Sequence, residues 1–231
     1  MQSITNEDKI ARGTRLGKIG VFVSLGFLGA GLLMSLTLQE SPYFWISLGF
    51  LLLGLLASSV GTTNMNRWVR EPRADQALAH GLAGFDDRYR LYNYTLPAPH
   101  VLLSPKGLFV ITALGQDGVI RYDGTKFRRD FSLGRLFRFM ADEGLGRPLS
   151  RADSEVEKLR GFLDAHEVGK ETEIQSILVF YNPRAELLIS SAPCPVIDPK
   201  GLNKAVRTQE GEDLSRKQYR RLWELFDGAL D

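Results

Sequence analysis

The sequence predicts a two-helix transmembrane hairpin followed by an α+β domain, an α/β sandwich with a central mixed sheet flanked by helices. Two observations predict the hairpin. Residues 19–38 and 41–65 contain no Asp, Glu, Lys or Arg, and only a short connection separates them. A third observation predicts the domain. The remaining chain alternates helix-like and strand-like patterns in the order helix, strands, helix, strands, helix, which is typical of this fold class.

The two uncharged segments are each long enough to cross a membrane. About 20 apolar residues at a rise of about 1.5 Å each span a hydrocarbon core of about 30 Å. Backbone groups in lipid must form their hydrogen bonds internally, so we expect helices at 19–38 and 43–63. The connection at 39–42 permits only a tight turn, which makes the helices antiparallel neighbours. A cleaved signal peptide is the alternative for the first segment, but its length and the second span argue against it.

Both predicted spans contain the pentapeptide Ser-Leu-Gly-Phe-Leu, at residues 24–28 and 47–51. Small residues such as Gly26, Gly49 and Gly54 permit two helices to approach closely, although biased composition explains the repeat equally well. The spans contain no ionisable residue, and this argues against an ion or proton path. Anchoring in the lipid bilayer is therefore the expected role, and the hairpin is also a candidate surface for a protein partner or for homo-oligomers.

Basic residues flank the outer ends of both spans. They are Lys9, Arg12, Arg15 and Lys18 before the first span, and Arg67, Arg70 and Arg73 after the second. The turn carries only Glu40, so the positive-inside rule places both termini in the cytoplasm. We expect an integral protein of a prokaryotic plasma membrane. The segments are then a cytoplasmic stretch at 1–18, the hairpin at 19–63, a basic juxtamembrane linker at 64–73 and a cytoplasmic domain at 74–231.

The composition of residues 67–231 does not indicate strong binding to polyanions. Four of the 29 basic and three of the 27 acidic residues precede residue 67, so residues 67–231 carry 25 and 24. Cys194 is the single cysteine, which excludes an internal disulfide and fits a reducing compartment. We expect it to be a small residue of the core or of a strand. His80, His100 and His166 lack the spacing of zinc ligands, and no metal or other cofactor is expected.

Local patterns predict the elements of the domain in order. Apolar residues at helical spacing predict a helix at 75–82, a second at 153–163 capped by Ser150 or Asp153, and a third at 213–230. β-rich runs separated by turn residues predict a meander of three or four strands at 100–103, 108–114, 119–122 and 126–131. A further aromatic run lies at 85–94. The continuous apolar run at 174–181 predicts a buried strand, and 187–190 and 195–197 resemble short edge strands.

An ordered series of motifs in the domain resembles the nuclease-related domain (NERD) family. The series comprises Leu-Ala-Gly-Phe at 82–85, His-Val-Leu-Leu-Ser-Pro-Lys-Gly at 100–107, Leu-Phe-Val-Ile at 108–111, Val-Phe-Tyr-Asn-Pro-Arg at 179–184 and Cys-Pro-Val-Ile at 194–197. That family belongs to the PD-(D/E)xK superfamily, so the resemblance implies a restriction-endonuclease-like fold. It also implies an ancestral chemistry of metal-assisted phosphodiester hydrolysis. Two carboxylates then hold Mg²⁺ and a lysine stabilises charge.

The residues at the matching positions depart from the family pattern. Pro99 stands where the resemblance implies the first carboxylate, and Thr112 and Leu114 stand at the second carboxylate and the lysine. Arg151 corresponds to a glutamine of the family, and only the acidic group of the first helix, Asp75, is kept. Proline and leucine cannot ligate a hard cation, and threonine is a poor substitute for a carboxylate. The resemblance therefore indicates a degenerate nuclease-like domain.

A basic stretch with interleaved aromatic residues follows these positions. It comprises Arg121, Lys126, Arg128, Arg129, Arg135 and Arg138. One interpretation is a surface for nucleic acid or anionic lipid headgroups. The interpretation that we favour is a solvated strand face, because the charge excess is modest.

Three hypotheses about function follow. The leading one is a catalytically inactive, membrane-anchored binding or scaffold module at the cytoplasmic face. The second is an active, Mg²⁺-dependent nuclease with a relocated site, for which Asp117, Asp123 and Lys126 are the local candidates. The third is a structural subunit of a membrane complex.

Overall fold

The computed structural model describes residues 1–37, 44–130, 144–208 and 213–229. The chain divides into two compact units. The described part of one unit consists of residues 1–6, 74–130, 144–208 and 213–229. The described part of the other consists of residues 7–37 and 44–73. Each unit is treated by itself below.

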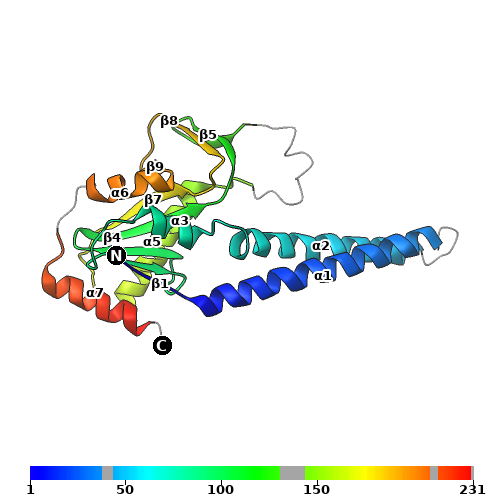
Figure 1. Cartoon of the computed structure of the whole chain (residues 1–231), viewed down its shortest axis with the longest axis horizontal. Coiled ribbons are helices and arrows are strands. Elements are labelled where there is room, and N and C mark those ends of the chain that lie inside the picture. The colour runs from blue at the N-terminus through cyan, green and yellow to red at the C-terminus, as the bar shows by residue number, and fades with distance from the viewer. Residues whose placement is uncertain (38–43, 131–143, 209–212, 230–231) are drawn as a thin grey trace. The chain divides into compact units, whose positions relative to one another are not determined.

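The first unit is built on a six-stranded mixed sheet (Figure 1). In spatial order its strands are β1 (Gln2–Thr5), β2 (Arg90–Asn93), β3 (His100–Ser104), β4 (Gly107–Leu114), β7 (Ile174–Phe180) and β9 (Val196–Ile197). β2, β3 and β4 form an antiparallel meander, whereas the β1–β2, β4–β7 and β7–β9 pairs are parallel. A parallel return from β4 to β7 requires a crossover, and α5 supplies it.

Helices cover both faces of this sheet. On one face, α3 (Ala74–Gly81) and α6 (Pro199–Thr208) share a core with Phe109 and Ile111 of β4. On the other face, α5 (Pro148–Ala165) and α7 (Arg216–Gly228) share a core with Leu108 and Val110. The two sets of β4 residues alternate because successive side chains of a strand point to opposite faces. This arrangement confirms the predicted α/β sandwich.

A second, three-stranded sheet holds part of the predicted meander. It consists of β6 (Phe127–Arg129), β5 (Gly118–Tyr122) and β8 (Ala185–Ile189) in that order, with β8 parallel to β5. A single continuous meander was therefore wrong beyond β4. Ile120 of β5 packs with Leu114 of β4 and Phe180 of β7 in a third core. Local turn signals cannot reveal a strand partner that is so distant along the chain.

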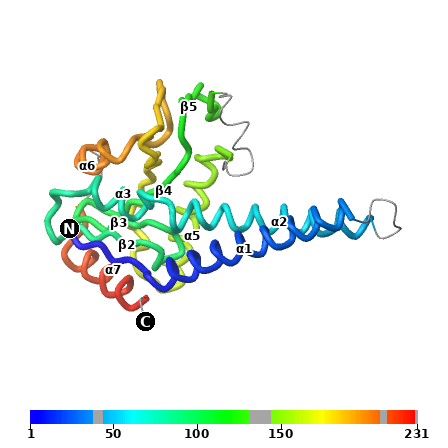
Figure 2. Tube along the Cα trace, turned by 45° about the vertical axis from the view of Figure 1, so that its right-hand side comes forward, coloured from blue at the N-terminus to red at the C-terminus, as the bar shows by residue number. Residues whose placement is uncertain are grey.

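The N-terminal segment contains a strand that the sequence did not predict, and its helix begins earlier than expected. Gln2–Thr5 form the edge strand β1 beside β2 (Figure 2), and the first long helix begins at Glu7. Ile4 packs into the core that contains α7, which gives the strand one apolar anchor. A four-residue strand with one apolar residue is too short for periodicity to detect.

Two helix boundaries also differ from the prediction, and one helix was missed. α5 begins at Pro148, with Arg147 as an N-cap that makes no side-chain cap hydrogen bond, so capping by Ser150 or Asp153 was wrong. Proline suits the first turn of a helix because its missing N–H has no partner there. α7 begins at Arg216 behind a capping box of Ser215 and Gln218. α6 was not predicted, since only Leu202 and Val206 mark its buried face.

The second unit contains two long apolar helices, α1 (Glu7–Thr37) and α2 (Phe44–Trp68). Both are long and apolar enough to cross a membrane. Their large apolar side chains point outward, and Phe22 and Trp45 are 73% and 75% exposed. A core helix of a soluble protein would bury such groups, so their exposure favours contact with lipid. The predicted connection at 39–42 lies outside the described residues.

The two helices pack along a seam of small residues. The buried positions include Ile10, Gly17, Ser24 and Gly31 in α1, and Ser47, Gly54, Gly61 and Trp68 in α2, each set at seven-residue spacing. That spacing keeps one face of each helix on its partner. Each copy of the repeated pentapeptide places its serine in this seam. The expected close approach at Gly26 and Gly49 was wrong, because a Cβ atom at either glycine would meet nothing within 4 Å.

Candidate functional site

Two of the positions that the resemblance singled out, Thr112 and Leu114, lie on β4 of the main sheet. Pro99 directly precedes β3, and the pairing of β3 with β4 runs from Val101–Val110 to Ser104–Gly107. Thr112 is fully buried and lies on the face of β4 that α5 covers, because its neighbours Ile111 and Ala113 lie in the core of the opposite face. Leu114 lies two residues further along the same face and packs in the third core.

A buried carboxylate occupies the space beside Thr112. The Thr112 hydroxyl donates a hydrogen bond of 2.6 Å to Oε2 of Glu155 in α5. The second carboxylate oxygen of Glu155, Oε1, accepts a hydrogen bond of 3.0 Å from Nε of Arg151, one helical turn away. Both oxygens of Glu155 are thus held by side chains of the chain itself. A buried carboxylate needs such partners, since an unpaired charge in the interior is costly.

Glu155 is the residue of this site that sequence reasoning missed. It lies on the buried stripe of α5 with Ala152, Leu159 and Leu163, at the spacing of one helical face. A charged residue within an apolar stripe was the available signal. Arg151 was identified only through the family glutamine, and the structure gives it the role of a partially exposed cation.

Asp75 lies apart from this cluster. It is buried in α3, on the face of the sheet opposite to Thr112 and α5. The one acidic group that the resemblance retained is therefore not joined to Thr112, Glu155 and Arg151.

His100 lies in a hydrogen-bond network that anchors β1. Its Nδ1 lies 2.8 Å from Oδ1 of Asn93, and the Asn93 amide donates to the hydroxyls of Ser3 and Thr5, each at 3.2 Å. The ring also packs edge-on against Tyr94, with 4.8 Å between centroids. Because the amide oxygen of Asn93 accepts, the geometry assigns a proton to His100 Nδ1. This network fits a structural role for His100.

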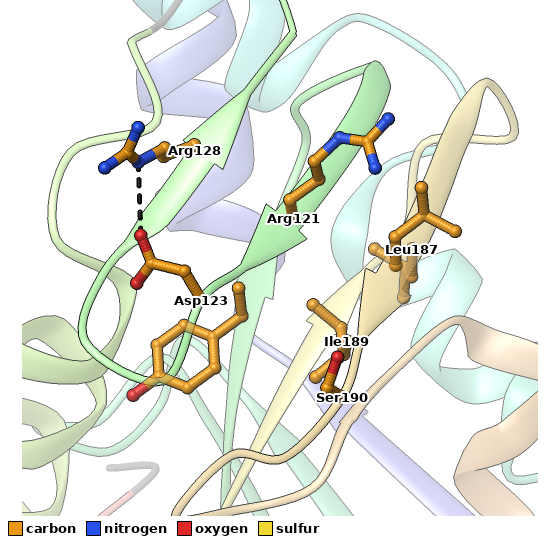
Figure 3. Close-up of a pocket in the computed structure, with 8 residues that line it drawn as sticks. Arg121, Asp123, Arg128, Leu187, Ile189 and Ser190 are labelled. Carbon is orange, nitrogen blue, oxygen red and sulfur yellow. Dashed lines mark ion pairs between the residues drawn. The ribbon is translucent and has the colours of Figure 1, made fainter.

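The basic stretch is largely neutralised by carboxylates on the small sheet. Arg121 pairs with Asp130 at 3.0 Å, Arg128 pairs with Asp123 at 3.2 Å, and Arg129 pairs with Asp117. Figure 3 shows the Arg128–Asp123 pair among the residues that line an open pocket. The pocket has a volume of about 660 Å³ and is formed by β5, β6 and β8. Lys126 is exposed in the same hairpin, whereas Arg135 and Arg138 lie outside the described residues.

The acidic residues of this hairpin have structural partners. Oδ1 of Asp123 accepts hydrogen bonds from the Thr125 hydroxyl and from the backbone N–H groups of Lys126 and Thr125. These bonds, the Thr125 hydroxyl first, hold the pKa of Asp123 well below its usual range. Asp123 therefore closes the β5–β6 turn, as the sequence suggested. In the described parts of the chain, no group of three or more His, Cys, Asp or Glu side chains is arranged to hold a metal ion.

Cys194 is a free thiol that packs at the margin of the third core. Burial raises its pKa, and a hydrogen bond with the side chain of Ser176 partly offsets this rise. A raised pKa leaves the thiol protonated and weakly nucleophilic at neutral pH. The expected role as a small residue of the core fits this environment.

Replacing Thr112 with Val tests the contribution of the buried cluster. Valine keeps the shape of threonine but cannot donate to Glu155, so we expect the free energy of unfolding to fall by about 2 kcal/mol. Urea unfolding of the detergent-solubilised chain, followed by circular dichroism, measures the change. Thr208→Val is the matched control, because the exposed Thr208 hydroxyl donates only to backbone carbonyls of its own helix. Equal stability of the two variants would contradict the cluster.

Comparison with known proteins adds no relative to this description. The chain matches no family model, no curated protein and no solved structure.

Proposed function

We propose that this protein is a membrane-anchored, nuclease-related domain that has lost nuclease activity and acts as a binding or scaffold module at the cytoplasmic face. The observation that carries the proposal is the Thr112–Glu155–Arg151 cluster. The resemblance requires Pro99 and Thr112 to be neighbours at a strand end, and Pro99 directly precedes β3, the strand that pairs with β4. Beside Thr112, the Arg151 guanidinium pairs with the buried Glu155 carboxylate and balances its charge. The carboxylate therefore needs no metal ion as a counter-charge.

The anchoring part of the proposal is supported by the two long apolar helices with outward-facing side chains. Strand β1 supports the orientation. It precedes α1 directly and pairs with β2 of the domain, so a membrane-crossing hairpin must begin and end on the side that holds the domain. The basic residues around both outer ends then favour the cytoplasmic side.

A cleavage assay tests the loss of activity. We expect the full chain in detergent, supplied with Mg²⁺ or Mn²⁺, to cut neither single-stranded nor duplex DNA above the rate of a buffer blank. A variant with Glu155→Gln serves as the matched control, because the Glu155 carboxylate accepts a hydrogen bond from Thr112, one of the degenerate positions. Metal-dependent cleavage that Glu155→Gln abolishes would contradict the proposal.

The relocated nuclease site is the second candidate, and the same assay addresses it. Glu155 is the observation in its favour, since it places one buried carboxylate beside Thr112. Cleavage abolished by Asp117→Asn or Asp123→Asn would instead support the site on the β5–β6 hairpin. A role as a structural subunit, with the hairpin as the docking surface, remains a prediction.

A further inference from the structure

The two long helices stay packed beyond their apolar spans. α1 begins well before its uncharged segment at 19–38. A Cβ atom at Gly13 would overlap the indole of Trp68, and one at Gly17 would lie 3.1 Å from the backbone nitrogen of Met65. The first turns of α1 therefore lie directly against the end of α2, and the side chains on their outer side project from a rigid helix pair.

Trp45 and the helix rise locate these turns relative to a bilayer. Trp45 is 75% exposed near the start of α2, as expected of an aromatic residue at a membrane interface. A hydrocarbon core of about 30 Å corresponds to about 20 residues of helix, so the opposite interface lies near Met65. Gly17 of α1 packs against Met65. This boundary of the hydrocarbon core therefore falls beside Lys18, the last charged residue before the first span.

Four basic side chains lie at this boundary or just beyond it. Arg15 and Arg12 are about 5 and 9 Å further from the core along α1 than Lys18, and the headgroup layer is about 5–8 Å thick on each side. Arg67 follows Met65 by two residues and so lies near the depth of Arg15. All four side chains are exposed. Arg12, Arg15, Lys18 and Arg67 are called the basic collar here.

The basic collar faces away from the seam between the helices. The buried side of α1 carries Gly13 and Gly17, and its exposed side carries the cations together with Leu16, which is 57% exposed. An exposed leucine among cations suits the border between acyl chains and headgroups, because apolar and charged groups meet there. The guanidinium carbon of Arg67 lies 4.8 Å from the ring centroid of Trp68, a contact that orients this cation.

We propose that the basic collar binds the phosphate-bearing headgroups of anionic phospholipids. The inference rests on the proposed anchoring by α1 and α2 and goes beyond it, because an anchor needs no preference among lipids. Clusters of about four or more basic residues directly beside a membrane span attract anionic lipids of the cytoplasmic leaflet. A planar arginine guanidinium can donate two parallel hydrogen bonds to one phosphate, and Lys18 adds a point charge closest to the hydrocarbon core.

Depth distinguishes lipid headgroups from other anions. A nucleic acid or an acidic protein segment would have to enter the headgroup layer to reach Lys18 and Arg15, whereas phospholipids already occupy that layer. The acidic residues lie further out. Asp8 is about 15 Å from Lys18 along α1, and Glu71 follows the end of α2. At this end of α1 and α2, the charged residues nearest to the apolar spans are therefore all basic.

Native mass spectrometry of the full chain in a mild detergent tests this inference. Phosphatidylglycerol and phosphatidylcholine are titrated separately, and the bound lipid is counted at each concentration. We expect phosphatidylglycerol to bind about tenfold more tightly, and Arg15→Gln/Lys18→Gln to lose about tenfold in affinity for it. The matched control Arg216→Gln/Lys217→Gln removes one arginine and one lysine from the exposed start of α7, and should change the affinity less than about twofold.

A charge-conserving variant separates headgroup binding from helix packing. Arg15→Lys/Lys18→Arg keeps both positive charges at headgroup depth, so we expect its phosphatidylglycerol affinity to stay within about threefold of that of the unchanged chain. Circular dichroism of each variant measures its helix content, which should be kept because the substituted side chains are exposed.

Three results would overturn the inference. They are equal affinity for the two lipids, an equal loss of affinity in the two glutamine double variants, and displacement of bound phosphatidylglycerol by an oligonucleotide at equal phosphate concentration. The comparison of the two lipids uses the unchanged chain, so it decides the question even where a variant fails to fold. Binding in detergent does not depend on membrane topology, so its failure leaves the proposed anchoring at the cytoplasmic face to a separate test of topology.

Discussion

Replacing Gly61 with Leu should separate the two long helices. A Cβ atom at Gly61 would lie 2.7 Å from the backbone nitrogen of Val21 and 2.9 Å from the carbonyl carbon of Gly20. Backbone atoms of a helix cannot move aside as a flexible side chain does, so the helices must part. We expect the free energy of hairpin association to fall by about 3 kcal/mol.

Titration of SDS into micelles that contain the full chain measures this loss, with tertiary structure followed by tryptophan fluorescence. Gly49→Leu is the matched control, because a Cβ atom there meets nothing within 4 Å. Both substitutions raise helix propensity equally, so only the packing differs. Loss of structure at the same SDS fraction in Gly61→Leu and Gly49→Leu would contradict close helix packing at Gly61.

Replacing Asp227 with Ala should detach the C-terminal helix from the sheet. The Asp227 carboxylate accepts hydrogen bonds from Arg90 Nη1 at 2.9 Å, from the Tyr92 hydroxyl at 2.7 Å and from the indole N–H of Trp223. Burial, and then the Asp227 carboxylate, raise the pKa of Tyr92 far above its usual range, so the phenol stays protonated and donates. Removing the shared acceptor leaves the half-buried Arg90 guanidinium and the buried phenol without this partner.

We expect Asp227→Ala to lower the free energy of unfolding by about 3 kcal/mol, since three donors lose one acceptor. Asp86→Ala is the control, because Asp86 pairs with Arg88 at an exposed position, where such a pair contributes little to stability. Urea unfolding gives the energies, and amide hydrogen exchange in α7 locates the change. Unchanged protection of α7 in Asp227→Ala would show that Leu222 and Phe226 hold the helix alone.

The sequence predicts those parts of the fold whose signal is local. The two long helices and the buried strand β7 are recognisable as continuous apolar runs. The apolar side of α7 is recognisable from residues at helical spacing. β1 and α6 were missed because each is short and held by one or two apolar residues with distant partners. The parallel pairing of β5 with β8 was missed for the same reason, since register between distant strands is set by packing.

The candidate site was predictable only in outline. Pro99, Thr112 and Leu114 were placed together through the resemblance, whereas the partner of Thr112 is a helical glutamate that no motif marks. The ion pairs of the β5–β6 strands could not be predicted from the sequence either. The arginines of these strands alternate with aspartates in sequence, but only the fold shows that each arginine meets one.

The membrane topology tests the central claim most directly. Single cysteines are introduced at Lys9, Glu40 and Lys200 in a Cys194→Ser background, and a membrane-impermeant maleimide is applied to right-side-out and inverted vesicles of a prokaryotic host. We expect positions 9 and 200 to react only in inverted vesicles and position 40 only in right-side-out vesicles, since β1 and the domain share one sheet. Labelling of positions 9 and 200 from opposite sides, or of all three from one side, would contradict a membrane-crossing hairpin that anchors a cytoplasmic domain.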